Sequence, residues 1–223
     1  MDPSAPPAFN PQWTKNNFID YSNDNSNRCD YVIAIDKSGS TAITDCNGSS
    51  RWSRMQDYAI TFAQIAEQRD PDGITIIPFN HTFQIFDNVT SKTVADVFAQ
   101  NKPSGGTLLA PVLNKVFNDF LKKKKNEEIE RLCLLVLSDG RPSDTTQVEN
   151  EIISFSHKLS STYDAAILFI QIGYDAEATT WLKKLDDELK GPHKAKFDIV
   201  DHKNIDWVES NSIEEALKQA FID

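Results

Sequence analysis

The chain has 223 residues, of which 39% are hydrophobic and 25% charged, and its net charge is −10. This length and composition are typical of one globular domain around a single core. The acidic balance excludes nucleic acid as an expected partner, because phosphate binding requires a basic surface. The one basic cluster, the lysines at 122–125, is followed at once by Glu127, Glu128 and Glu130, which we expect to compensate it in a solvated loop.

No segment approaches the ~18 apolar residues that a membrane-spanning helix requires, and residues 1–11 lack the basic and apolar regions of a signal peptide. We therefore expect a cytoplasmic protein that does not act on membranes. Cys29, Cys46 and Cys133 form no paired framework and no Cys-x-x-Cys metal clip, so we expect all three to be reduced.

In chain order, residues 1–28 are rich in Pro, Asn, Ser and Asp without apolar periodicity, which predicts a flexible leader before a folded domain at 29–223. Short apolar or β-branched runs then alternate with segments of helical periodicity. The runs that we expect to be strands are residues 31–35, 74–79, 82–86, 132–137, 166–172 and 197–200.

Four segments place apolar residues on one helical stripe. The first runs from Trp52 to Ala66 and the second from Leu109 to Phe120. The third includes Val148 and Leu159 behind a Thr146/Glu149 capping box, and the last includes Ile213 and Ala220 behind a Ser212/Glu215 box.

Strands such as 132–137 are apolar at successive positions, so both of their faces must be covered. This predicts an α/β, Rossmann-like, doubly wound fold with helices on both faces of a mostly parallel six-stranded sheet. The second and third strands are close enough in sequence to form a hairpin, which gives one antiparallel edge strand. Ligands of such folds bind at the carboxyl ends of the strands.

Two predicted strands end in a carboxylate, at Asp36 and at Asp139. The first continues as Asp-Lys-Ser-Gly-Ser, so Ser38 and Ser40 occupy alternate positions of the turn, and a Gly-Gly-Thr loop adds Thr107. Two carboxylates and three hydroxyls are oxygen ligands that suit a hard cation, with Mg²⁺ expected and Mn²⁺ or Ca²⁺ as alternatives.

Each residue also has a simpler interpretation when it is taken alone. Asp36 or Asp139 could cap a helix or end a strand, the two serines could be turn formers, and Thr107 could be an N-cap. The metal interpretation depends on their combination at three loops that the fold brings to one edge.

The order strand-Asp-x-Ser-x-Ser, Gly-Gly-Thr-helix, strand-Ser-Asp-Gly resembles the von Willebrand factor A (VWA) domain and its metal-ion-dependent adhesion site (MIDAS). The resemblance covers about residues 29–222 and is nearest to stand-alone intracellular members, through the phrases at 70–74 and 197–201. It implies that Ser38 and Ser40 bind the ion directly, and that Asp36, Thr107 and Asp139 bind it directly or through water.

The sequence departs from adhesive members of that family just after the second serine. Thr41 stands where secreted members often have Met, and Ile43 and Thr44 stand where integrin β-type members have acidic residues, so a second cation site is not expected. Asp45 remains an alternative contributor. The loop at 45–50 is either a specificity loop on the rim or an ordinary exposed loop.

The resemblance implies a metal-dependent binding module, not an enzyme, that binds a Glu or Asp carboxylate of a protein partner. We expect it to be a monomer. An Mg²⁺-dependent hydrolase or phosphotransferase is an alternative, although Ser38 stands where the haloacid-dehalogenase type requires a second Asp. The other alternative is a scaffold in which the ion has a purely structural role. Arg141 could contact an acidic partner or pair with Asp144, and the last helix could shift on binding.

Overall fold

A computed structural model gives the positions of residues 29–68, 72–191 and 194–220. The expected leader at 1–28 lies outside these described residues. None of the described helices is long and apolar enough to cross a membrane.

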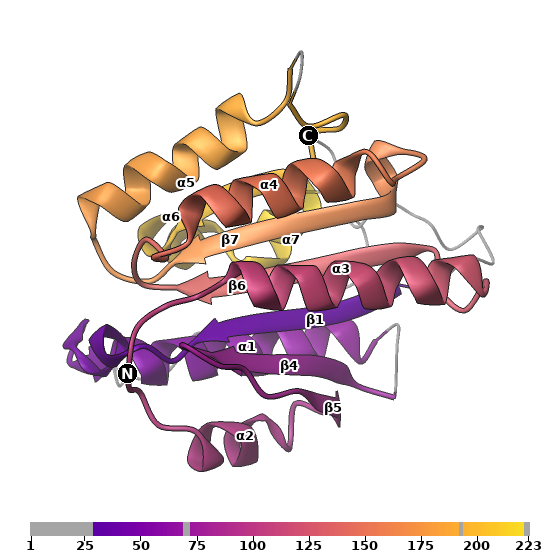
Figure 1. The fold of residues 1–223 in the computed structure, drawn as a ribbon. Helices are drawn as coiled ribbons and strands as arrows, with labels where there is room; N and C mark the ends of the chain where they lie inside the picture. Colours follow the sequence, from indigo (N-terminus) through magenta and orange to yellow (C-terminus); the bar gives the residue numbers. More distant parts are fainter. Residues whose placement is uncertain (1–28, 69–71, 192–193, 221–223) are drawn as a thin grey trace.

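A six-stranded sheet passes through the centre of the described residues in the order β5-β4-β1-β6-β7-β8 (Figure 1). All neighbours pair in parallel except β5, which pairs antiparallel with β4 at one edge. The expected mostly parallel sheet with one antiparallel edge strand is therefore confirmed. The strands are β1 (Cys29–Asp36), β4 (Ile74–Phe79), β5 (Phe86–Val89), β6 (Arg131–Ser138), β7 (Ala165–Gln171) and β8 (Val200–Asn204). A separate small hairpin consists of β2 (Thr44–Cys46) and β3 (Ser49–Ser50).

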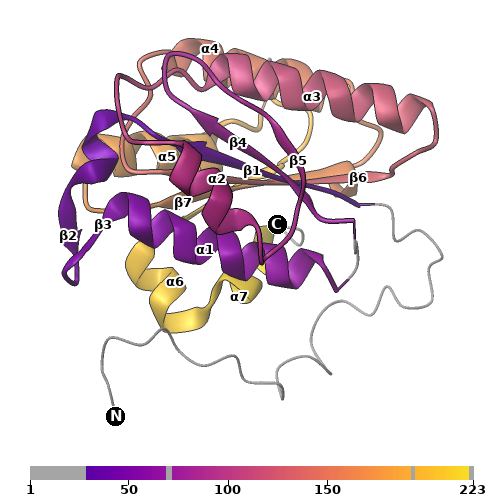
Figure 2. The same cartoon turned by 90° about the horizontal axis from the view of Figure 1, so that it is seen from below.

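Helices cover both faces of the sheet, as Figure 2 shows with α3 and α4 on one side and α1, α6 and α7 on the other. One face carries α1 (Arg51–Ala66), α2 (Val94–Gln100), α6 (Ile205–Asn211) and α7 (Ile213–Ala220). The other carries α3 (Ala110–Lys125), α4 (Thr145–Ser156) and α5 (Ala176–Glu188). Two short 3₁₀ helices are η3 (Gly39–Ala42) and η4 (Thr162–Asp164).

The strand periodicity of two divides the core into two layers. In β1, Ile33 and Ile35 pack on the α1 side, whereas Val32 and Ala34 pack on the α3 side. On the second side the rings of Phe117 and Phe155 stack with centroids 3.9 Å apart, which joins α3 to α4. Both layers are apolar, which is why β1 and β6 read as continuous apolar runs.

Two predicted strands are displaced along the chain. The run at 82–86 was expected to be a strand, but Asn80 and Thr82 form a tight turn there and β5 begins only at Phe86. The strand expected at 197–200 begins at Val200 and continues to Asn204. This edge strand is mostly polar, so a search for apolar runs finds only its first residue.

Of the two predicted capping boxes, one is wrong and the Ser212 cap of the other is present. The Thr146/Glu149 capping box is wrong, because α4 begins at Thr145 with Asp144 at its N-cap. The Ser212 cap is present, since its hydroxyl accepts from the Glu215 N–H at 3.2 Å.

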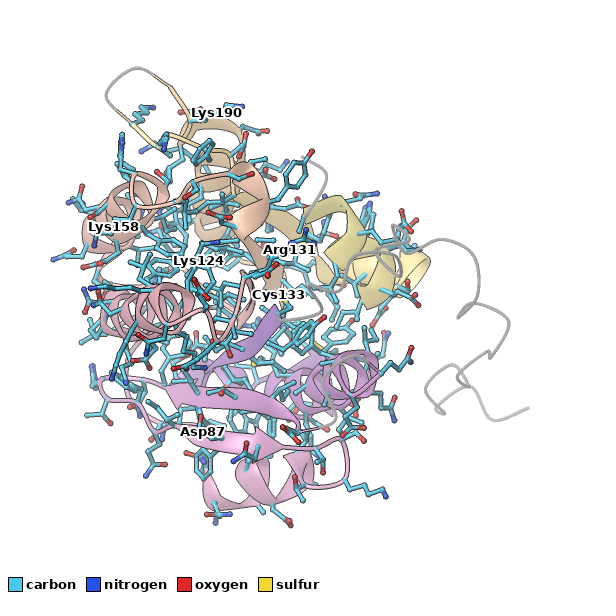
Figure 3. The ribbon with its side chains drawn as sticks, turned by 90° about the vertical axis from the view of Figure 1, so that its right-hand side faces the viewer. Asp87, Lys124, Arg131, Cys133, Lys158 and Lys190 are labelled. Carbon is cyan, nitrogen blue, oxygen red and sulfur yellow. The ribbon has the colours of Figure 1, made fainter. Side chains whose placement is uncertain are left out.

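The lysines at 122–125 form the last turn of α3, not a loop, where basic side chains oppose the negative end of the helix dipole. Figure 3 faces this end of the molecule, with Lys124 and Arg131 labelled. Lys123 pairs with Asp30 at 2.8 Å and Lys124 with Asp164 at 2.9 Å. Carboxylates from other elements therefore compensate these two charges.

Candidate metal centre

The two predicted carboxylates lie at the carboxyl ends of neighbouring central strands. Asp36 ends β1, and Asp139 follows directly after β6. The chain adds β4 on one side of β1 and returns to place β6 on the other, so the two strands flank the point where the winding direction reverses. Open α/β sheets bind ligands at this point.

Asp36 is completely buried, and both of its carboxylate oxygens accept hydrogen bonds. The Ser38 N–H donates to Oδ1 at 2.8 Å, and the Ser138 hydroxyl donates to Oδ2 at 2.9 Å. Burial, followed by the nearby charge of Asp139, raises the pKa of Asp36 to about 6. A negative charge is therefore costly at this position in the absence of a cation.

A continuous line of oxygen atoms connects the first loop to Asp139. The Ser38 and Ser40 hydroxyl oxygens are 3.1 Å apart, and the Ser40 hydroxyl donates to Asp139 Oδ1 at 3.0 Å. Ser38 and Asp139 are buried, whereas Ser40 is exposed. The structure therefore brings the oxygen atoms of Ser38, Ser40 and Asp139 together, as expected from the sequence.

The loop that carries Thr107 is hydrogen-bonded to the Asp36–Ser40 loop through the backbone. The Gly39 N–H donates to the Gly105 carbonyl at 3.1 Å, and the Ser104 N–H donates to the Lys37 carbonyl at 2.7 Å. Thr107 is half-buried, and its hydroxyl makes no hydrogen bond to another described residue. These contacts place its loop against the first loop.

Thr107 is not the N-cap of α3, since that helix begins three residues later at Ala110. The capping carboxylate comes from Asp144, which accepts from the N–H groups of Leu109 at 3.1 Å and Ala110 at 2.9 Å. Asp144 therefore stabilises the start of α3. The sequence had offered a pair with Arg141 as the alternative role of this carboxylate, and the structure shows the helix cap instead.

His81 fixes the turn before Thr107. Its Nε2 accepts from the Gly106 N–H at 3.0 Å, so the neutral tautomer carries its proton on Nδ1. A Cβ added to Gly106 would lie 2.7 Å from His81 Cε1, so a side chain at this position would displace the imidazole. Asn80 adds a second contact by donating to the Ser104 carbonyl at 2.9 Å.

Arg51, the first residue of α1, reaches across to the site. Its Nη1 donates to Asp139 Oδ2 at 2.9 Å, and its Nε and Nη2 donate to Asp45 at distances of 2.6 to 3.2 Å. The hydrogen bond from Arg51 lowers the pKa of Asp45. Asp45, considered from the sequence as a possible ligand, is thus the ion-pair partner of Arg51.

No family model matches the sequence, and no curated protein matches it significantly. Solved structures do match. The D319A mutant of the PilB minor pilin from Streptococcus sanguinis has a TM-score of 0.54 at 12% identity, over 88% of this chain and 60% of the pilin chain. The pilus adhesin SpaC from Lactobacillus rhamnosus GG has a TM-score of 0.59 at 12% identity, over 89% of this chain and 31% of its own.

The manganese-loaded TRAP protein of Plasmodium vivax has a TM-score of 0.53 at 12% identity, over 88% of this chain and 74% of its own. The chain has a VWA-like fold. It matches less than two thirds of the pilin and of the pilus adhesin, and at this identity the likeness concerns the fold alone.

The donor set of this VWA-like domain fits a hard divalent cation. Within the described residues no group of three His, Cys, Asp or Glu side chains is placed to hold a metal, and the oxygen donors beside Asp36 and Asp139 are hydroxyls. Two buried carboxylates and the adjacent Ser38 and Ser40 hydroxyls are such a set. Burial, and then the charge of Asp139, raises the pKa of Asp36, and a cation at this place would stabilise its ionised form.

Sequence reasoning missed three residues around this site. Ser138 was identified only as part of a motif, although its place opposite the end of β1 follows from the strand pairing. Arg51 and His81 have no local signal, because each reaches the site from an element far along the chain.

Proposed function

We propose that the chain is a metal-dependent protein-binding module with its cation at Asp36, Ser38, Ser40, Thr107 and Asp139. The observation that carries this proposal is the oxygen line from Ser38 through Ser40 to Asp139, at 3.1 and 3.0 Å, beside the buried Asp36. A divalent cation, Mg²⁺ or Mn²⁺, would supply positive charge and a coordination position for a partner's Glu or Asp carboxylate.

The residues divide into two roles in this proposal. Ser38 and Ser40 present neutral oxygens, so they leave the positive charge of a cation largely uncompensated and available to an acidic ligand. Asp36 and Asp139, which are both buried, supply the negative charge of the proposed site. Ser138 orients Asp36, and His81 orients the Thr107 loop.

Binding is the function that these residues support better than catalysis. Ser38 lies two residues after Asp36, where a haloacid-dehalogenase-type enzyme has its acid/base carboxylate. The pilin, the pilus adhesin and the manganese-loaded TRAP protein share the fold, and the adhesin among them supports an adhesive role as the proposal to test first. A cytoplasmic location and a monomeric state remain predictions.

Affinity capture from the source cell tests the proposal. Immobilised wild-type protein is incubated with lysate in Mg²⁺ and again in chelator, beside the Ser38→Ala/Ser40→Ala double variant in Mg²⁺. The exposed α1 residue Thr61, as Thr61→Ala, is the matched control.

We expect partners that are retained by the wild type and by Thr61→Ala in Mg²⁺, and that are lost both in chelator and with the double variant. Competition by a short Glu-containing peptide, but not by its Gln analogue, should release the same partners. Retention that is identical with Mg²⁺ and with chelator would contradict the proposal.

A further inference from the structure

The guanidinium of Arg51 lies between two carboxylates at the proposed metal site. Its side chain is 13% exposed, while that of Asp139 is 1% exposed and that of Asp45 is 33% exposed. The guanidinium of Arg51, a residue of α1, contacts Asp139 on one side and Asp45 of the β2–β3 hairpin on the other. The positively charged side chain of Arg51 thus contacts Asp139, a carboxylate of the proposed metal site.

The position of Arg51 is not explained by stabilisation of helix α1. Arg51 is the first residue of α1, where a positive charge is unfavourable beside the positive end of the helix dipole. Space for the guanidinium is provided by Gly173, where a Cβ would lie 2.8 Å from Arg51 Nε. Gly173 has a φ of +92°, a conformation that favours glycine for a second reason.

We propose that Arg51 is the internal counterion of Asp139 in the ion-free protein and limits the affinity of the site for divalent cations. This inference rests on the proposed metal site. Asp139 has two oxygens, of which Ser40 holds Oδ1 and Arg51 holds Oδ2. An ion that approaches Asp139 meets a carboxylate whose charge Arg51 already compensates.

Asp45 sets how strongly Arg51 acts on the site. Its carboxylate takes the Nε and Nη2 side of the guanidinium and compensates part of the charge. Without this carboxylate, Arg51 would present its full charge to Asp139 and to an incoming ion. Opposite effects on metal affinity are therefore expected from the removal of Arg51 and from the neutralisation of Asp45.

Calorimetric titration of the chelator-stripped, full-length protein with Mn²⁺ alone tests this proposal. Arg51→Gln should bind Mn²⁺ at least about tenfold more tightly than the wild type, because an adjacent guanidinium weakens proton binding by a carboxylate by about 1–3 pKa units and should oppose a metal cation in the same sense. Asp45→Asn should bind it several-fold more weakly. The matched control is Arg54→Gln, whose guanidinium lies on the same helix but pairs with Asp57 and Glu209.

A double variant separates the proposed mechanism from a general change of charge. In the Arg51→Gln background, Asp45→Asn should have a much smaller effect than in the wild type, because its action passes through Arg51. Arg51→Lys, which keeps the charge, should bind Mn²⁺ with an affinity close to that of the wild type. If Arg51→Gln does not fold, Asp45→Asn still tests the inference, because Mn²⁺ affinity equal to that of the wild type would overturn it.

The outcomes distinguish this inference from the proposed function. Equal Mn²⁺ affinity in the wild type, Arg51→Gln and Asp45→Asn would overturn the role of Arg51 and leave the metal site standing. Equal gains in Arg51→Gln and Arg54→Gln would also overturn it, since net charge alone would then account for the change. If none of these proteins binds Mn²⁺, both the inference and the proposed function fail.

Discussion

Replacement of Asp36 by Asn is predicted to stabilise the ion-free protein and to abolish its response to metal. The asparagine can keep both hydrogen bonds of the aspartate. Its amide oxygen can accept from the Ser38 N–H, and its amide nitrogen can donate to the Ser138 hydroxyl, which can then donate to the Gly140 carbonyl at 3.1 Å. Only the buried negative charge is lost.

The size of the effect follows from the pKa of Asp36, which burial and then Asp139 raise from 3.8 to about 6. Because the folded-state value is the higher one, the favourable contribution of Asp36 is complete below pH 3.8 and is lost as the pH rises through about 6. Above that pH, the ionised group costs about 3 kcal/mol of folding free energy. For a chain of this size, this corresponds to an increase of about 6–12 °C in Tm for Asp36→Asn.

Thermal and urea unfolding in chelator should therefore show a higher stability for Asp36→Asn than for the wild type at pH 8, with little difference at pH 3.5. On addition of Mg²⁺ or Mn²⁺, the wild type should gain stability and Asp36→Asn should not. Our reasoning would be refuted by an Asp36→Asn protein that is less stable than the wild type in chelator at pH 8, or that gains as much from metal.

Three further predictions concern the surroundings of the site and the core. Gly106→Ala should weaken Mn²⁺ binding and cost about 1–3 kcal/mol in urea unfolding, because its Cβ would meet His81, and the cost should be smaller in a His81→Ala background. Phe155→Ala should cost about 3–5 kcal/mol of unfolding free energy and leave the Mn²⁺ affinity unchanged, a result that calorimetry on the folded variant checks. Burial lowers the pKa of His202 from 6.5 to about 4. The wild type should therefore lose stability relative to His202→Gln as the pH falls from 6.5 to 4, since the unfolded chain binds a proton that the folded chain does not. A pH-independent difference in urea unfolding would contradict that assignment.

The sheet and its apolar layers could be predicted from the sequence because burial on both faces leaves a local signal. The apolar run in β6 can be recognised without its neighbours, and Asp139 stands directly after it in the sequence. Helices α2, α5 and α6 were not predicted. The first and last have only seven residues each, which is too short for a clear stripe.

The surroundings of the site were less predictable because they depend on contacts between distant segments. Arg51 and Asp139 are 88 residues apart, and His81 and Gly106 are 25 apart, so no local spacing relates them. Asp144 shows the same difficulty, since its carboxylate caps α3, a helix that begins 34 residues before it.

The most direct test of the proposed metal centre is an anomalous difference map from a crystal of the full chain grown with Mn²⁺. We expect one strong peak within bonding distance of the Ser38 and Ser40 hydroxyl oxygens, with Asp36, Thr107 and Asp139 in contact directly or through water. A map from such a crystal with no peak between these loops, whether or not a peak appears elsewhere, would contradict the proposed metal centre.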